Sequence, residues 1–332
     1  MIAESIAQQF KTIVGQDNAW TDAADLHTYA YDAAVVEPVR PGIVVRPTTT
    51  EALGKAVRLC NDHRLPLTVR GAGTNLSGGT VPLENGVVIV TNGLKSILEI
   101  NEADMYAVVQ PGVVTAKLAA AVETKGLFYP PDPGSQAVST IGGNVAENAG
   151  GLRGLKYGVT RDYVMGLSFF DVEGNLVKSG SRTVKCATGY NLTGLMVGSE
   201  GTLGVFAEII LKLIPLPAHR KAMMAVFESL EKASEAVAAI IADRIVPATL
   251  EFLDNFTIRA VEDFSKAGLP VDAAAMLLVE LDGHKAQVEE DAARVEALCQ
   301  SMGATSIRVA QDAAERDRAW AARRAALSAL AQ

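Results

Sequence analysis

The sequence predicts an α+β protein of two domains, and three observations carry this prediction. Turn residues close two hairpins in the first two thirds of the chain, where a doubly wound sheet would need alternating strands and helices. Pro215 and Pro217 interrupt a long apolar strand that begins near Gly204, so we place the domain boundary there. After the boundary, strands and helices follow one another in two βαβ-like rounds. The expected domains are residues 1–217, which include an N-terminal helical segment, and residues 218–332.

In the first domain, an amphipathic helix is expected over residues 50–63. Thr48 and Glu51 have the spacing of a capping box at its start. Its apolar side chains recur at i, i+3, i+4 and i+7, at Leu53, Ala56, Val57 and Cys60. Buried strands are expected at 65–69 and from Val87. A hairpin at 97–110 that turns at 101–104, a helix at 115–125 and a hairpin around 173–175 complete the pattern.

In the second domain, the periodicity of the apolar residues predicts seven elements. They are strands at 223–227, 249–253 and 305–309, an apolar strand-like run at 273–281, and helices at 229–244, 255–266 and 285–302. Two βαβ-like rounds predict a ferredoxin-like arrangement. The final stretch, 311–332, is expected to form one helix.

The glycine-rich stretch from Ile141 to Gly151 is the most informative part of the sequence. Ser139 and Thr140 precede it and can cap a helix N-terminus. Gly142 and Gly143 would each cost about 1 kcal/mol relative to alanine inside that helix. Close approach of a ligand to the backbone compensates for this cost, and a helix N-terminus favours an anion. The stretch therefore predicts contact with an anionic group such as a pyrophosphate.

A second glycine loop, residues 70–79, follows the strand expected at 65–69. Its backbone N–H groups, helped by the side chains of Thr74, Asn75 and Ser77, can form a nest for phosphate oxygens. The loop is not a Rossmann fingerprint, because Pro82 and the turn residue Asn85 argue against a helix directly after it. A structural turn without a ligand is the alternative.

These two loops, followed by Gly198-Ser-Glu-Gly-Thr-Leu-Gly-Val205, resemble the FAD-binding domain of the vanillyl-alcohol oxidase and p-cresol methylhydroxylase (PCMH) flavoprotein family. Within this family, the chain is most similar to the branch of glycolate oxidase and D-lactate dehydrogenase. The resemblance covers residues 40–217 closely and the remainder more loosely. It implies a two-subdomain FAD-binding domain of PCMH type, followed by a ferredoxin-like cap domain.

Carried over position by position, the resemblance assigns the FAD contacts to these glycine segments and to one further turn. The backbone amides of the first loop are expected on the pyrophosphate. The expected cofactor contacts are Arg70, Gly71, Ala72, Gly73, Thr74, Asn75, Ser77, Gly78, Gly112, Pro131, Asp132, Ser139, Thr140, Gly142, Gly143, Asn148, Gly151, Tyr157, Gly201, Gly204 and Val205.

The resemblance also implies that FAD is bound noncovalently. Relatives that attach FAD covalently often carry a histidine where this chain has Thr74, and no other nucleophile stands in that loop. Cys186 lies in a separate segment, where we expect it to pack as a small buried residue. The alternative is that its thiol approaches the site.

Composition agrees with a cytoplasmic enzyme. The chain has 332 residues, 49% of them hydrophobic, which is enough for two cores. Its net charge of -8 and the lack of a basic patch argue against nucleic acid or an anionic membrane surface as the main partner. Three widely separated cysteines disfavour a disulfide framework or a zinc cluster, and reduced thiols are expected. The N-terminus lacks the basic start of a signal peptide. Peripheral attachment to a membrane through a partner stays open.

The chain ends where members of the resembled branch continue with a segment that completes the substrate pocket. We therefore expect a truncated chain with a partial cap domain. The branch generally places its catalytic base and its metal ligands in that further segment, so a divalent metal is expected only through it. The four histidines show no metal-ligand spacing; they are His27, His63, His219 and His284.

Arg323 is the one candidate for substrate binding. It follows Trp320 and matches the arginine that related D-2-hydroxyacid dehydrogenases use for the substrate carboxylate. A planar guanidinium suits a carboxylate bidentately. The alternative is a solvated arginine at a helix C-terminus, where the helix dipole favours positive charge. Glu200 is assigned to ordering its loop.

The resemblance implies oxidation of a 2-hydroxy acid, of the glycolate or D-lactate class, to the 2-oxo acid, with hydride passing from Cα to flavin N5. An electron acceptor must then reoxidise FAD: a quinone, a flavoprotein or an iron-sulfur subunit. An oligomer or a complex is therefore expected. The alternatives are a non-catalytic FAD-binding or electron-transfer subunit of a larger oxidase, an alkyl-ether lipid synthase and an amino-sugar reductase.

Overall fold

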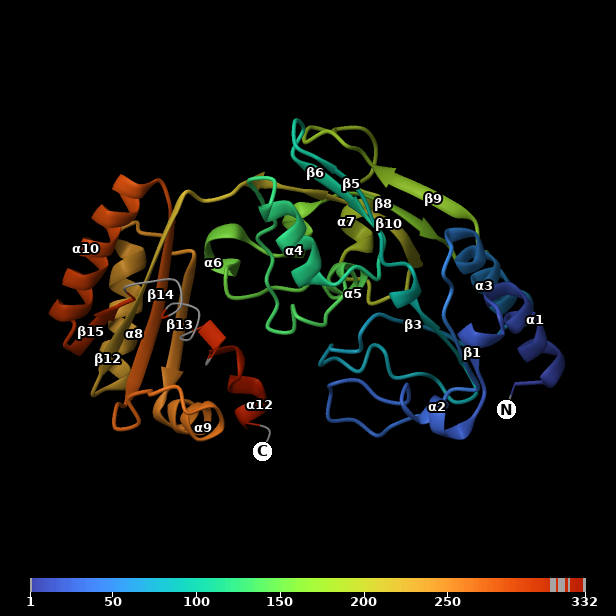
Figure 1. Ribbon diagram of the computed structural model, residues 1–332, viewed down its shortest axis with the longest axis horizontal. Helices are drawn as coiled ribbons and strands as arrows, with labels where there is room; N and C mark the ends of the chain where they lie inside the picture. Colours follow the sequence, from blue (N-terminus) through green and yellow to red (C-terminus); the bar gives the residue numbers. More distant parts are fainter. Residues whose placement is uncertain (1, 311–314, 316–319, 322, 331–332) are drawn as a thin grey trace. The chain divides into compact units, whose positions relative to one another are not determined.

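The computed structural model describes residues 2–310, 315, 320–321 and 323–330. Its internal contacts divide the chain into two compact units. The first unit comprises residues 1–150 and 159–216, and the second comprises residues 151–158 and 217–332. Both units combine helices with sheets, so the α+β class expected from the sequence is confirmed (Figure 1).

A four-stranded sheet in the first unit leads into the glycine loop of residues 70–79, which is the first of the glycine segments along the chain. Its strand order is β1-β2-β4-β3. Strand β4 (Val87–Val90) lies parallel to both β2 (Ile43–Val45) and β3 (Leu67–Arg70), while β1 (Ala19–Trp20) pairs antiparallel with β2. All four residues of β4 are buried, as expected for a strand inside a parallel sheet. The glycine loop of residues 70–79 begins at Arg70, the last residue of β3.

Helix α3 (Thr50–Asp62) packs against this sheet and confirms the predicted amphipathic helix. Its N-cap is Thr49, whose Oγ1 accepts a hydrogen bond from the backbone N–H of Ala52 at 3.1 Å. The capping box predicted at Thr48 and Glu51 is wrong, because the helix begins one residue later. An alanine then stands where the box needs a glutamate or glutamine.

The second sheet of the first unit is antiparallel, with the order β5-β6-β10-β8-β9. It confirms both predicted hairpins. Phe170 on β8 shares a buried core with α3, and a Cβ at Gly54 would lie only 2.5 Å from its ring. Gly54 therefore lets the helix approach this sheet closely. The strands are β5 (Ile97–Asn101), β6 (Tyr106–Val109), β8 (Val164–Phe170), β9 (Leu176–Gly180) and β10 (Val205–Lys212).

Shorter elements complete the first unit. They are α1 (Glu4–Val14), α2 (Ala23–His27), α4 (Thr115–Glu123), α5 (Ile141–Glu147), α7 (Leu192–Met196), β7 (Leu127–Phe128), β11 (Ile214–Pro215), and the 3-10 helices η1 (Gln16–Asn18), η2 (Thr91–Gly93) and η3 (Thr160–Tyr163).

The second unit is built on one antiparallel sheet with the order β13-β14-β12-β15. This order confirms the predicted ferredoxin-like topology. Helices α8 and α10 cover one face of the sheet, where apolar side chains of both helices and of β12 and β14 form a buried core (Figure 1). The elements are α8 (Leu230–Ala242), α9 (Asn255–Ser265), α10 (Lys285–Ser301), β12 (His219–Phe227), β13 (Thr249–Asp254), β14 (Ala275–Gly283) and β15 (Ala304–Val309).

The opposite face of this sheet is mixed in character. Leu253, Met276 and Leu278 pack there with Ile258 of α9 and with Trp320. Further along the same strands come acidic residues, and the short helix α6 (Gly154–Tyr157) also belongs to this unit. The single helix predicted for 311–332 lies largely outside the described residues. Within them, Glu315, Trp320, Ala321, Arg323 and Arg324 are helical, Ala325 forms a turn, and α12 (Ala326–Leu330) follows.

Within the described residues, no helix combines the length and the apolar character needed to cross a bilayer. All three cysteines carry free thiols. Cys60 and Cys299 are buried, and burial raises the pKa of Cys299 to about 11. Cys186 is exposed, so its predicted role as a buried packing residue is wrong. It lies in an exposed loop between β9 and α7, where no core surrounds it.

Candidate functional site

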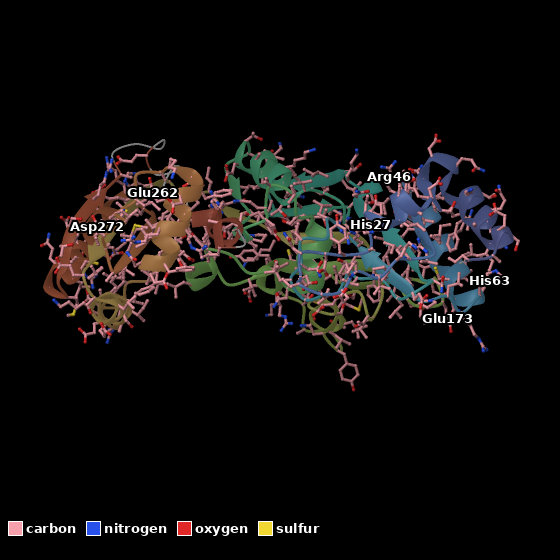
Figure 2. The ribbon with its side chains drawn as sticks, turned by 90° about the horizontal axis from the view of Figure 1, so that it is seen from below. His27, Arg46, His63, Glu173, Glu262 and Asp272 are labelled. Carbon is pink, nitrogen blue, oxygen red and sulfur yellow. The ribbon has the colours of Figure 1, made fainter. Side chains whose placement is uncertain are left out.

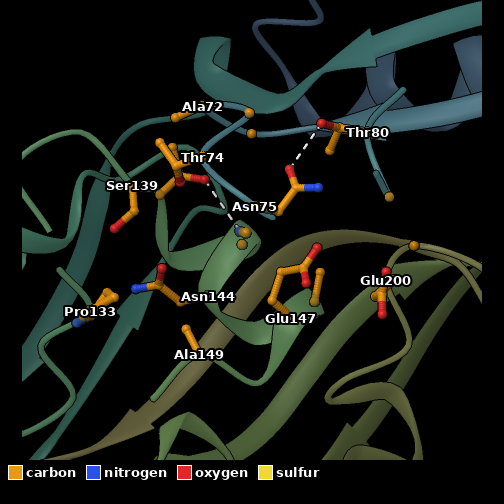
Figure 3. Close-up of a pocket in the computed structure, with 18 of the residues that line it drawn as sticks. Ala72, Thr74, Asn75, Thr80, Pro133, Ser139, Asn144, Glu147, Ala149 and Glu200 are labelled. Carbon is orange, nitrogen blue, oxygen red and sulfur yellow. Dashed lines mark hydrogen bonds between the residues drawn. The ribbon is translucent and has the colours of Figure 1, made fainter. Parts of the chain in front are cut away.

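The predicted glycine segments meet at one cavity of about 310 Å³ in the first unit. Its lining includes Gly71 to Asn75 from the loop after β3, Ser139, Thr140, Gly142 and Gly143 from the start of α5, and Gly201 with Gly204 from the segment before β10. Figure 3 shows Asn75 and Thr80 on one wall and Glu147 and Glu200 facing them.

The two glycines at the start of α5 have different roles. Thr140 is the N-cap, and its Oγ1 accepts a hydrogen bond from Gly143 N at 3.2 Å. A Cβ at Gly142 would lie 2.5 Å from Pro111 Cβ, so the chain's own packing requires that glycine. A Cβ at Gly143 would meet only Thr140 Oγ1, at 3.2 Å. Both glycines line the cavity, but only at Gly143 does the chain's own packing leave the missing side chain unexplained.

The first glycine loop presents unbonded amides to the cavity. Within the part of the chain that the structure describes, the backbone N–H groups of Ala72 to Leu76 have no hydrogen-bond acceptor. Gly73 adopts a positive φ of 71°, and a Cβ at Gly71 would collide with Thr140 Oγ1. The loop thus lies directly against the start of α5, and its free amides suit the oxygens of an anionic pyrophosphate.

Arg70 supports this loop from behind and does not line the cavity. Its side chain is buried at 7% exposure, and Nη1 donates to the carbonyl of Tyr31 at 2.6 Å. Burial lowers the pKa of Arg70, while the nearby carboxylate of Asp32 acts in the opposite direction. A Cβ at Gly73 would run into the Arg70 guanidinium. The arginine therefore places positive charge directly behind the glycine loop.

Asp32 fixes the second half of the loop, and the sequence contained no local signal for this. Its Oδ2 accepts a hydrogen bond from Asn75 Nδ2 at 2.6 Å, and Thr80 Oγ1 donates to Asn75 Oδ1 at 2.9 Å. Ala33 N also donates to the Asn75 carbonyl. Asn75 is thereby committed to shaping the loop.

Two carboxylates form another wall of the cavity. Ser77 Oγ lies 3.3 Å from both carboxylate oxygens of Glu147 and 3.1 Å from Glu200 Oε2. Burial raises the pKa of Glu147, and the neighbouring negative charge of Glu200 adds to this effect. Such a wall disfavours phosphate and favours hydroxyl groups, which donate hydrogen bonds to carboxylates. Glu200 was predicted to order its loop, and Glu147 was not predicted.

The remaining predicted contacts lie outside the cavity lining, so their contact with the cofactor stays a prediction. Gly112 packs against backbone, because a Cβ there would lie 2.5 Å from the carbonyl oxygen of Thr91. Asn148 ends α5 in the left-handed conformation, and Tyr157 donates a hydrogen bond to Asp282 within the second unit. The full set outside the lining is Arg70, Ser77, Gly78, Gly112, Pro131, Asp132, Asn148, Gly151, Tyr157 and Val205.

Several lining residues were missed by the sequence analysis. Most lie next to predicted positions, so a continuous reading of each glycine segment would have included them. Phe206 directly follows the predicted Val205, whereas Thr91, in η2 after β4, had no such signal. The missed residues are Val69, Leu76, Gly79, Thr80, Thr91, Pro111, Pro133, Gly134, Ser135, Asn144, Ala146, Glu147, Ala149, Gly150 and Phe206.

The histidines are divided between the two units. His27 and His63 lie apart within the first unit (Figure 2). His219 lies 3.1 Å from Glu289 and shares that carboxylate with Lys221. Among the described residues, no three metal-ligating side chains cluster.

Arg323 lies on the second unit and is already engaged by a carboxylate. Its Nε and Nη2 lie 2.6 and 2.5 Å from Oε2 of Glu251 on β13. Trp320, three residues earlier, donates its indole N–H to Glu280 Oε2 at 2.7 Å. The next residue, Arg324, has a buried Nε with no hydrogen-bond partner among the described residues.

The glycine-lined cavity and the two-unit fold define the class of protein: an FAD-linked oxidoreductase. Residues 41–180 match the FAD binding domain family, and residues 216–332 match the C-terminal domain of FAD linked oxidases. The chain belongs to this family of FAD-linked oxidases, together with glycolate oxidase subunit GlcD. The expected family, the PCMH-type fold and FAD as the cofactor are confirmed.

Three comparisons give the extent of the similarity. The chain is 46% identical over 332 residues to glycolate oxidase subunit GlcD of Bacillus subtilis (strain 168), covering 100% of this chain and 71% of that protein. It is 37% identical over 306 residues to a D-lactate dehydrogenase of Anaerostipes hadrus, covering 90% of this chain and 64% of that protein. The structure of p-cresol methylhydroxylase with substrate bound matches with a TM-score of 0.80 at 19% identity, covering 95% and 68% of the two chains, and shows the shared fold. The chain thus spans about two thirds of the length of these proteins.

Proposed function

We propose that this chain forms the FAD-binding part, and some of the substrate-binding part, of a dehydrogenase for a 2-hydroxy acid of the glycolate or D-lactate class. The supporting observation is a cavity lined by backbone N–H groups that have no acceptor among the described residues. The chain that forms it is 46% identical to a glycolate oxidase subunit. A D-lactate dehydrogenase among the relatives supports the same substrate class. Turnover of glycolate and D-lactate by the full-length FAD-loaded enzyme tests this proposal.

Bound FAD would supply an acceptor for the hydride that leaves the substrate Cα. The chain's own residues would bind and orient the cofactor. The amides of residues 72–76 would hold the pyrophosphate, with the buried Arg70 charge behind them. The carboxylates of Glu147 and Glu200 would accept hydrogen bonds from hydroxyl groups of the cofactor.

Arg323 would bind the substrate carboxylate. A guanidinium has five N–H donors, and the Nε and one Nη2 donor go to Glu251. The outer edge, formed by Nη1 and Nη2, keeps the parallel pair of donors that a carboxylate needs. Arg323 is only 31% exposed, which strengthens such a pair relative to a fully solvated one.

Arg323→Met is expected to lower kcat/KM by about tenfold to a hundredfold, the worth of a charge-assisted hydrogen-bonded pair of about 1.5 to 3 kcal/mol. FAD content should not change. Steady-state kinetics of the full-length FAD-loaded enzyme would measure this, and Arg323→Lys should recover only part of the loss because an ammonium lacks the planar fork. Arg324→Met is the matched control. Equal losses in both variants would assign the effect to general electrostatics and remove the specific role of Arg323.

We further propose that FAD is bound noncovalently, because Thr74 lines the cavity where a linking histidine would be needed. Acid precipitation of the holoprotein should release all of the yellow flavin into the supernatant. Colour that stays in the washed, denatured pellet would contradict this prediction.

The electron acceptor is proposed to be a partner: a quinone, a flavoprotein or an iron-sulfur subunit. The GlcD relative is named as one subunit of glycolate oxidase, which supports assembly into a complex. A cytoplasmic location, with peripheral membrane attachment through a partner as an option, is supported by three free thiols.

A further inference from the structure

Glu251 lies where it can set the direction of the Arg323 side chain. It stands on β13, on the sheet face that carries Leu253 and lies opposite the core formed with α8 and α10. Its side chain is 18% exposed. Both of its contacts with Arg323 use the same oxygen, Oε2, which receives Nε and Nη2 together. This geometry fixes the plane of the guanidinium as well as its position.

A second carboxylate holds the same turn of chain. Glu280, on the neighbouring strand β14, is 5% exposed and accepts the indole N–H of Trp320. Trp320 and Arg323 are three residues apart, so both face the same side of a helical turn. In the strand pairing, Glu251 lies opposite Leu278 and Glu280 lies opposite Thr249, which makes the two carboxylates diagonal neighbours. They thus hold the turn at two points.

A carboxylate beside Arg323 has two opposing effects on a substrate carboxylate. It orients the guanidinium and lowers the entropy lost on binding, but it also offsets the positive charge. A flexible arginine side chain loses rotamer freedom of about 2 kcal/mol when it is immobilised. The use of one edge by Glu251 leaves the outer edge of the guanidinium intact. When the substrate carboxylate binds at that outer edge, the gain from orienting the guanidinium therefore outweighs the offset of its positive charge.

We propose that Glu251 is a positioning residue that presents the outer edge of Arg323 to the substrate carboxylate. This inference rests on the proposed function. It assigns Glu251 no contact with the substrate and no part in the chemical step. It follows that Glu251 affects binding of any small carboxylate, whether or not that molecule can be oxidised.

Oxalate is the probe, because it has a carboxylate but no Cα–H to give. In the full-length FAD-loaded enzyme, its binding is followed as a change in flavin absorbance. Glu251→Gln keeps the size of the side chain and one accepting oxygen but removes the charge. We expect the oxalate Kd and the substrate KM to rise by about tenfold, with kcat changed less than about twofold. Glu251→Asp should recover part of the affinity. Glu289→Gln, at an ion pair in the same unit with Lys221, is the matched control and should leave the oxalate Kd unchanged.

A double-mutant cycle separates positioning from a structural effect. In an Arg323→Met background, Glu251→Gln should cause no further loss, and it should restore some affinity because an unpaired carboxylate repels the substrate. Losses that add in the double variant, or tighter oxalate binding by Glu251→Gln alone, would overturn the inference while leaving the proposed function standing. A wild-type enzyme that neither binds oxalate nor turns over any 2-hydroxy acid would overturn both.

Discussion

Gly143→Val is expected to abolish FAD binding while the first unit stays folded. A Cβ at this position would touch only Thr140 Oγ1, at 3.2 Å, so the added methyl groups would extend into the cavity. Valine has a better helix propensity than glycine, and Gly143 lies inside α5. The affinity for FAD should fall by roughly a hundredfold or more, equivalent to about 3 kcal/mol. Flavin absorbance of the purified protein and titration with added FAD measure this, with circular dichroism reporting the fold.

Gly142→Val is the matched control, one residue earlier in the same helix. Its side chain would collide with Pro111, and overpacking of this kind costs about 1 to 3 kcal/mol. This variant should lower the melting temperature of the apoprotein more than Gly143→Val does, because the contact at Gly143 is longer, 3.2 Å against 2.5 Å. Unchanged FAD affinity in Gly143→Val would show that the cofactor does not approach this backbone, and the assignment of the cavity would be wrong.

Lys156→Met is expected to destabilise the second unit by about 3 kcal/mol. Lys156 Nζ lies 2.5 Å from Oδ1 of Asp282, whose side chain is only 1% exposed, and 2.6 Å from its carbonyl oxygen. Tyr157 donates to the same carboxylate at 2.8 Å. Removing the lysine leaves a buried negative charge without its cation, which typically costs about 3 to 5 kcal/mol. The lower end applies here because the lysine itself is 29% exposed.

Urea unfolding followed by Trp320 fluorescence, in a Trp20→Phe background, would report on the second unit alone. Lys266→Met is the control, because its ion pair with Asp263 is 72% and 85% exposed. Exposed pairs contribute less than about 1 kcal/mol. Equally small losses in both variants would mean that Tyr157 and the surrounding structure satisfy Asp282 without the lysine.

Most of the secondary structure followed from short-range rules. The helix at 50–63, both hairpins of the first unit and the strand and helix order after Pro217 depend on apolar spacing and turn residues a few positions apart. Two predictions that depended on one exact position were wrong. The capping box at Thr48 and Glu51 was off by one residue, and Cys186 was exposed, because hydrophobicity alone does not place a residue in a core.

The sequence by itself determined the family, the cofactor and the three glycine segments around the cavity. Each glycine segment is a contiguous stretch, so the backbone conformation that requires its glycines can be recognised from the local sequence. Only the tertiary structure decided which of the two glycines the chain's own packing requires, because a side chain would meet Pro111 at Gly142 and not at Gly143. It also paired Asp32 with Asn75, Lys156 with Asp282 and Glu251 with Arg323. Each of these pairs joins residues 43 to 126 positions apart. Local propensity carries no information over such separations, and burial of apolar surface on the sheets brings these residues together.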